Sequence, residues 1–201
     1  MIGKYWMERA KHDGENFNGL CMYKIDSELG QAYYTDMLWA FEYADMNRKA
    51  IMKNILALLG LKFSDYEKNM INETHNHAII TDAGVLHRKG ATPAEKGVKG
   101  VIPGNMRDGV FVTEGLGNEE YLSSSSHGAG RRMSRTAAKK KIVYQDVRDE
   151  MNALGIVVDL TSKNIDESPD AYKDVFDVLA QQIDIVINMV DHFRPKIVHI
   201  G

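Results

Sequence analysis

The chain is poor in cysteine and proline: its 201 residues include one cysteine, Cys21, and four prolines. A single cysteine excludes an internal disulfide framework and is typical of a reducing compartment. The sequence also lacks any run of about 18 apolar residues, and its first residues lack the apolar core of a secretory signal. We therefore expect a cytoplasmic protein with no membrane partner.

Neither sign of charge is in large excess. Lysine and arginine number 25 against 28 aspartates and glutamates, giving a formal net charge of -3. A chain with this balance is not a generic nucleic-acid binder, so any such binding must come from local patches. With 44% hydrophobic residues it can bury a sizeable core. We expect residues 1–201 to form a single domain or a domain fragment.

Hydrophobic spacing predicts both helices and strands, and hence an α+β fold of mixed β-sheet layers with flanking helices. The clearest helix is expected over residues 31–59, where Gly60 is a natural terminator. Further helices are expected over 1–12, 134–141, 144–154 and 174–193. Strands are expected over 77–81 and 84–88 as a hairpin, and over 109–113, 156–160 and 196–200. Loops are expected over 13–30 and 90–104. The first helix starts without a capping residue, which indicates that part of the fold lies upstream.

The run from Ser123 to Gly130 carries the most specific chemical signal. Four serines precede His127, and Gly128-Ala129-Gly130 follow it. Small residues let a phosphate approach the backbone, and the basic block that follows can neutralise phosphate charge. His127 is therefore a candidate nucleophile toward phosphorus. The same pattern, taken alone, equally fits a glycine turn before a solvated basic helix.

Two further segments carry groups that suit metals or phosphates. His75 and His77 would point the same way in a strand, so His75 is a candidate metal ligand, although a lone histidine is more often structural. Arg88-Lys89 before Gly90 could clamp a phosphate or could be a solvated strand end.

A turn and a tyrosine complete the candidates from pattern alone. The Pro103-Gly104 turn presents Asn105, whose amide could contact a nucleotide or simply complete the turn. Tyr172 precedes an expected helix and could stack on a base or pack internally.

In this order, the segments resemble the RtcB family of RNA ligases. The matching segments are Ile25-Asp26-Ser27, Gly30-Gln31, Tyr43-Ala44, Asn47-Arg48, His75-Asn76, Arg88-Lys89-Gly90-Ala91, Ile102-Pro103-Gly104, Met106, Gly115–Glu120, Ser126–Arg131, Met133-Ser134-Arg135, Tyr172-Lys173-Asp174 and Gly201. The resemblance covers nearly the whole chain, but members of the family are about twice as long. It implies the C-terminal half of such a ligase. The family's metal-binding aspartate, cysteine and two further histidines would then lie upstream, on a complementary N-terminal fragment.

The resemblance also implies an activity. RtcB-type ligases use GTP and Mn²⁺ to join RNA 3′-phosphate or 2′,3′-cyclic phosphate ends to 5′-hydroxyl ends. His127 matches the histidine that carries GMP, and His75 matches a metal ligand. A non-catalytic RNA-binding remnant of such a ligase is the alternative.

Other matches concern ligand contacts. Positions implied to hold GTP or GMP are Asn76, Asn105, Gly128, Ala129, Gly130 and Tyr172. Positions implied to hold RNA phosphates are Arg88, Lys89, Arg131 and Arg135. The chain departs from the family at Ile200, where a lysine is typical, and at Asn105 and Val110, where serines are frequent. Isoleucine cannot donate a hydrogen bond to guanine.

Overall fold

The computed structural model describes residues 2–200, so Gly201 and the first residue of the expected N-terminal helix lie outside the described residues. Its helices and small sheets confirm the α+β class. Contacts group the chain into two compact units, residues 1–72 with 77–87 and residues 73–76 with 88–201, and each is described by itself. Among residues 2–200, no helix is both long enough and apolar enough to cross a membrane.

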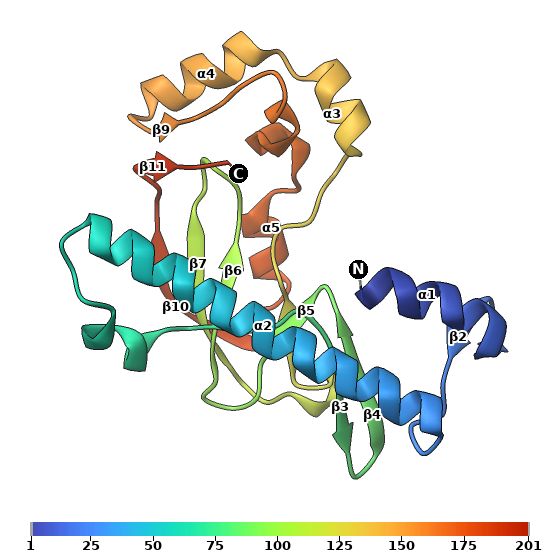
Figure 1. Ribbon diagram of the computed structural model, residues 1–201. Coiled ribbons are helices and arrows are strands. Elements are labelled where there is room, and N and C mark those ends of the chain that lie inside the picture. Colours follow the sequence, from blue (N-terminus) through green and yellow to red (C-terminus); the bar gives the residue numbers. More distant parts are fainter. Residues whose placement is uncertain (1, 201) are drawn as a thin grey trace. The chain divides into compact units, whose positions relative to one another are not determined.

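The first unit is built on one long helix, α2 (Glu28–Leu58), as expected (Figure 1). Ser27 starts it, because its Oγ accepts a hydrogen bond from the Gly30 amide at 3.0 Å. The helix ends in a Schellman turn: Gly60 has φ +73°, and the Leu61 amide donates to the Leu56 carbonyl at 2.8 Å. The predicted terminator is confirmed, while the start lies a few residues earlier than expected.

Helix α1 (Ile2–Asp13) packs on α2 through Trp6. The buried indole donates from Nε1 to Asp36 Oδ2 at 2.8 Å, and the rings of Tyr23 and Tyr33 meet it edge-on at 5.8 and 5.5 Å. The expected loop between the helices is wrong in part, because β1 (Glu15–Phe17) and β2 (Leu20–Met22) pair there as an antiparallel hairpin. Asn18 and Gly19 turn the chain with positive φ angles.

Two 3-10 turns, Phe63–Asp65 and Glu67–Asn69, follow α2. The predicted hairpin is then confirmed as β3 (Asn76–Thr81) paired with β4 (Gly84–Lys89). His77 is buried on β3, and its ring meets the Phe41 ring edge-on at 6.1 Å. His77 is therefore a packed core histidine of the first unit.

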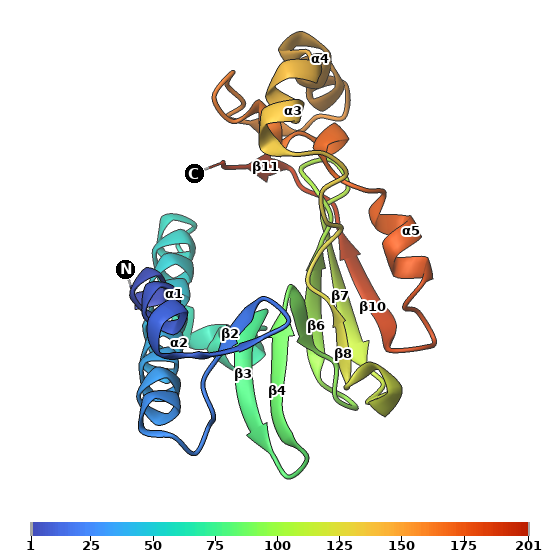
Figure 2. The same cartoon turned by 90° about the vertical axis from the view of Figure 1, so that its right-hand side faces the viewer.

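The second unit contains a three-stranded antiparallel sheet in the order β10-β7-β6. Its strands are β6 (Lys99–Pro103), β7 (Val110–Gly115) and β10 (Ile187–Phe193). Ile102 and Phe111 on this sheet are fully buried, and the short helix α5 (Val175–Ala180) lies alongside it (Figure 2). Val175 and Leu179 of α5 complete this core.

A second core lies at one end of that sheet (Figure 2). Helix α4 (Tyr144–Ala153) contributes Val147 and Met151 to it, and Ile165 comes from a 3-10 turn, Ile165–Glu167. Helix α3 (Arg135–Lys141) starts at Ser134, whose Oγ accepts from the Ala137 amide. The other elements here are a second 3-10 turn, Pro169–Ala171, and the parallel pair β9 (Val157–Val158) and β11 (Ile197–Val198).

Two expectations for this unit are wrong. The expected helix over 174–193 ends at Ala180, and β10 follows it after a turn in which Asp184 has φ +63°. Strand β10 begins only at Ile187, and it pairs with the edge of β7 that β6 leaves open. The expected loop over 90–104 contains β5 (Ala91–Pro93) as well as β6, because both find antiparallel partners.

Candidate functional site

His75 and His127 lie side by side in the second unit. Their rings stack with centroids 4.9 Å apart and planes 13° from parallel, and both residues are exposed. His75 precedes β3, and His127 follows β8 (Ser124–Ser126), which pairs antiparallel with β5 so that Ala91 lies opposite Ser126. The structure thus brings together the two histidines that the resemblance singled out.

The Gly90 backbone orients the His127 ring. The Nδ1 of His127 is 2.6 Å from the Gly90 carbonyl oxygen. A carbonyl only accepts, so Nδ1 carries the proton and the neutral ring keeps its lone pair on Nε2. Gly90 has φ +70°, and a Cβ there would lie 3.3 Å from Cε1 of His127, so glycine suits this position on two grounds.

The serines before His127 bond within the protein. Ser125 Oγ lies 3.0 Å from Thr92 Oγ1 across the buried β5–β8 pair. Gln182 accepts from the Ser126 amide at 2.8 Å and donates to Ser126 Oγ at 2.8 Å. Sequence reasoning missed Gln182, since it placed that residue inside a long amphipathic helix. These bonds fix the strand that leads to His127.

The small residues after His127 pack against the Pro103 backbone. The buried Ala129 donates its amide to the Pro103 carbonyl at 3.2 Å, and a Cβ at Gly128 would lie 3.2 Å from that same oxygen. Gly130 has φ +73°, and its carbonyl accepts from the Lys173 amide at 2.9 Å. This last bond ties the glycine turn to the segment that carries Tyr172.

Asn76 and Asn105, which the resemblance implies to hold the nucleotide, have different surroundings. Asn76 is exposed next to His75, and its Oδ1 accepts from the Gly90 amide at 3.1 Å and from Lys89 Nζ at 3.2 Å. The Oδ1 of Asn105 accepts two amides of its own turn, and its Nδ2 donates to Asp108 at 2.7 Å. Asn76 therefore lies beside the histidine pair, while the side chain of Asn105 holds its own turn.

Tyr172 and Arg131 face each other across a short antiparallel bridge. The Arg131 guanidinium lies over the Tyr172 ring, 5.0 Å from its centroid, and donates to the Asp166 carbonyl at 2.8 Å. The Tyr172 hydroxyl donates to Glu167. Burial, helped by this bond to a carboxylate, raises the pKa of Tyr172 to about 12.

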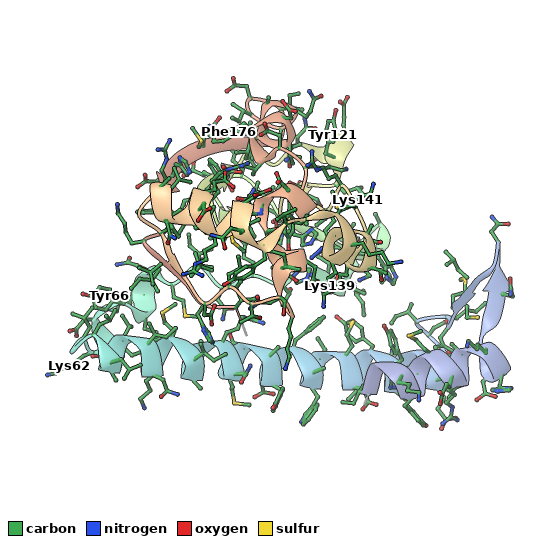
Figure 3. The ribbon with its side chains drawn as sticks, turned by 90° about the horizontal axis from the view of Figure 1, so that it is seen from above. Lys62, Tyr66, Tyr121, Lys139, Lys141 and Phe176 are labelled. Atoms are coloured by element: carbon green, nitrogen blue, oxygen red, sulfur yellow. The ribbon has the colours of Figure 1, made fainter. Side chains whose placement is uncertain are left out.

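The same carboxylates pair with the basic side chains of α3. Arg135 Nη1 lies 2.7 Å from Asp166 Oδ2, and Lys139 Nζ lies 3.3 Å from Asp166 Oδ1. Asp166 is almost fully buried, which opposes its ionisation, yet Arg135 and Lys139 lower its pKa below the usual range. Lys139 lies on α3 together with Lys141 (Figure 3). Sequence reasoning missed both acidic residues, Asp166 and Glu167.

Arg88 and Lys89 are neighbours in different surroundings. Lys89 is exposed, whereas the Arg88 side chain is 3% exposed and bonds to Glu95 Oε1 at 2.7 Å and Ser124 Oγ at 2.9 Å. Glu73 lies near this cluster, and its Oε2 is buried without a hydrogen-bond partner. Burial raises the pKa of Glu73 to about 7, repulsion from Glu95 adds to the rise, and Arg88 opposes it.

Within residues 2–200, no three histidine, cysteine, aspartate or glutamate side chains gather closely enough to hold a metal ion. Manganese accepts imidazole nitrogen beside harder oxygen ligands. The exposed His75 ring thus suits one position of such a site.

Comparison with known proteins identifies the family. The family described as tRNA-splicing ligase RtcB matches residues 1–201. An RNA-splicing ligase RtcB of Escherichia coli K12 is 39% identical over 206 residues, covering 92% of this chain and 49% of the relative. A tRNA-splicing ligase RtcB of Nanoarchaeum equitans is 32% identical over 202 residues, covering 85% of this chain and 42% of the relative. The chain spans about half the length of the Escherichia coli relative. It belongs to the RtcB family.

Proposed function

We propose that this chain is the C-terminal part of a GTP- and Mn²⁺-dependent RNA ligase. It would join RNA 3′-phosphate or 2′,3′-cyclic phosphate ends to 5′-hydroxyl ends through a GMP carried on His127. The observation that carries the proposal is the His127 ring, which is exposed, stacked on His75 and oriented by the Gly90 carbonyl. The names of the relatives support the class of reaction.

The orientation of His127 suits nucleophilic attack at phosphorus. Its Nε2 lone pair would form a P–N bond to the α-phosphorus of GTP while the bond to the bridging oxygen breaks and pyrophosphate leaves. The Gly90 carbonyl stabilises the positive charge that develops on the ring, because it accepts from Nδ1–H at 2.6 Å. Bound Mn²⁺ supplies charge neutralisation at the phosphates, and His75 would be one of its ligands.

GMP would then pass from His127 to an RNA 3′-phosphate. A cyclic phosphate would first be opened by water, because the resulting 3′-phosphate monoester is a dianion and a better nucleophile than the singly charged cyclic diester. The RNA 5′-hydroxyl attacks the activated phosphate, a phosphodiester forms, and GMP leaves. Among the residues expected to bind these ligands, Lys89 and Asn76 lie next to the histidine pair. Lys89 would face RNA phosphate, and Tyr172 would face the guanylate with Arg131 behind it.

The chain would work with a complementary N-terminal ligase fragment. It spans about half of its Escherichia coli relative, and α2 carries large apolar side chains that remain exposed along its length (Figure 3). These are Tyr33, Leu38, Trp39, Tyr43, Met46, Ile51, Met52, Ile55 and Leu58. An apolar surface of this extent is typical of an interface. The missing metal ligands would come from that fragment.

Guanylylation tests the proposal. The chain is mixed with the N-terminal half of its Escherichia coli K12 relative, Mn²⁺ and GTP labelled at the α-phosphate. Wild type should acquire an acid-labile label, as a phosphoramidate requires, and His127→Ala should acquire none. Lys53→Ala, an exposed change on α2, is the matched control and should label like wild type. An unlabelled wild type in a stable complex, or equal label on His127→Ala, contradicts the proposal.

A second candidate is a non-catalytic RNA-binding remnant. The exposed basic side chains of Lys89, Arg132 and Arg135 favour it. This candidate expects salt-dependent RNA binding by the chain alone that neither GTP nor Mn²⁺ alters. A guanylylated His127 would decide against it.

A further inference from the structure

Arg88 and Lys89 are consecutive on β4, so their side chains point to opposite faces. Lys89 is exposed and reaches Asn76, whereas the Arg88 side chain is 3% exposed. A phosphate could reach the Arg88 guanidinium only by displacing the protein groups that already surround it. The two cations therefore cannot have the same task.

The Arg88 guanidinium binds the first residue of β8 and the two residues before it. Its Nε donates to Ser124 Oγ at 2.9 Å, and its Nη2 donates to the carbonyls of Ser123 at 3.1 Å and Leu122 at 3.4 Å. The carboxylate of Glu95 accepts from the same Nη2 at 2.7 Å and balances the buried charge. One side chain thus contacts three consecutive residues of the chain.

Those three residues form a turn that needs support. Leu122 and Ser123 both have left-handed φ angles, +52° and +45°, which residues other than glycine rarely adopt. The turn leads directly into β8, a strand of three serines, which have little intrinsic preference for strands. Contacts from elsewhere in the fold must therefore hold this conformation.

The segment around Arg88 contacts His127 at the other end of β8. Two residues after Arg88, the Gly90 carbonyl accepts from His127 Nδ1 at 2.6 Å, and Ala91 lies opposite Ser126 in the β5–β8 pair. Residues 88–91 thus contact both the start and the end of the stretch from Leu122 to His127. A shift of the turn would move β8 along β5 and pull the imidazole from the Gly90 carbonyl.

We propose that Arg88 is a positioning residue for His127 and not an RNA contact. Its guanidinium holds the Leu122–Ser124 turn, and this keeps β8 in the register that places Nδ1 of His127 on the Gly90 carbonyl. The proposal rests on the proposed function only in treating His127 as the nucleophile. The contacts themselves belong to the chain alone.

The test records the ¹⁵N signals of the His127 imidazole in the whole chain labelled at histidine, because these shifts distinguish the Nδ1–H tautomer from its alternative. The His127 signals are identified by their loss in His127→Ala. Arg88→Lys keeps a positive charge opposite Glu95 but loses the planar guanidinium that donates from both Nε and Nη2. It should therefore shift the signals toward mixed tautomers. Ser124→Ala removes one acceptor and should cause a smaller shift in the same direction. Lys163→Met, an exposed change elsewhere in the second unit, is the matched control and should leave the signals unchanged.

A second measurement compares the salt dependence of RNA binding by Arg88→Met and Lys89→Met. Arg88→Met should keep the wild-type slope of log K against log salt concentration, whereas Lys89→Met should lower it by about one. If Arg88→Met fails to melt cooperatively, Arg88→Gln, which keeps N–H donors but carries no charge, takes its place and should show an unchanged slope. Unchanged His127 signals in folded Arg88→Lys and Ser124→Ala would overturn the proposal, as would a slope reduced by an Arg88 substitution. The ¹⁵N readout needs neither GTP nor RNA, so failure of the ligase reaction does not affect it.

Discussion

The two units differ in how well each buries its own apolar side chains. Among the described residues of the first, the buried apolar ones are Trp6, Leu56 and Ala78, although α2 alone is 31 residues long. The second contains two clusters, one around Ile102 and Phe111 and the other around Met151. The second unit therefore holds its candidate site on a packed core, while the long helix of the first leaves many large apolar side chains exposed.

The largest expected effect comes from breaking the core under the sheet of the second unit. Phe111 is fully buried, stacks on His192 at 4.1 Å and meets Phe176 edge-on. Phe111→Ala should lower the free energy of unfolding by about 3–5 kcal/mol, because it leaves a cavity. Denaturant melts measure this loss. The half-exposed Phe176 is the control, and Phe176→Ala should cost clearly less. Equal losses would mean that the core assignment is wrong.

An intermediate effect is expected on the exposed face of α2. Trp39 is 58% exposed and stacks on Tyr43 with centroids 5.9 Å apart. In the chain alone, Trp39→Ala should change the free energy of unfolding by no more than about 0.5 kcal/mol. Binding to the N-terminal half of the Escherichia coli relative should weaken by about 2 kcal/mol or more, as for a buried aromatic anchor.

Calorimetric titration measures this affinity, and Lys53→Ala on the same helix is the control. If Trp39→Ala instead destabilised the isolated chain and left binding unchanged, the apolar face would belong to an internal core. The contrast between the two units would then disappear.

The smallest effect concerns acid stability of the second unit. Burial opposes ionisation of Glu167, but hydrogen bonds from Tyr172 and Arg135 lower its pKa below the usual value. A carboxylate with a lowered folded pKa stabilises the fold above its unfolded pKa, about 4.3, and this contribution is lost as pH falls through the folded value. Glu167→Gln should therefore flatten the decline in thermal stability between about pH 5 and pH 3.

Melting temperatures across that range provide the measurement, and the exposed Glu119→Gln is the control. If the melting temperature of Glu167→Gln fell with pH as steeply as that of wild type, Glu167 would not contribute to the loss of stability in acid. In the ion pairs of the first unit, such as Asp45 with Lys49, the carboxylates are more exposed than that of Glu167 and should contribute less.

Some elements followed from local signals and others did not. The end of α2 was predictable because Gly60 terminates it within a few residues of its last turn. The β3–β4 hairpin was predictable because two apolar runs flank a short turn. The helix expected over 174–193 was wrong because the spacing of its apolar residues fits a helix while the edge of β7 offers a strand partner. Periodicity describes one segment and contains nothing about its neighbours.

The candidate site shows the same division. The types and order of its residues, His75, Arg88-Lys89 and His127 among them, point by themselves to phosphate chemistry and to the RtcB family. The environment of each residue did not follow from its type. Arg88 and Lys89 were indistinguishable as cations in the sequence, yet one is buried against Glu95 and the other is exposed.

By itself, the sequence determined the family and the long helix and singled out His127 as the candidate nucleophile, since these depend on residue types and on contacts within a few residues. Only the tertiary structure decided that His75 stacks on His127, that the Gly90 carbonyl selects the imidazole tautomer, and that Gln182 holds the strand before His127. These contacts join residues 37 to 56 positions apart in the chain. Such pairings depend on the packing of the whole second unit, and no local pattern in the sequence specifies them.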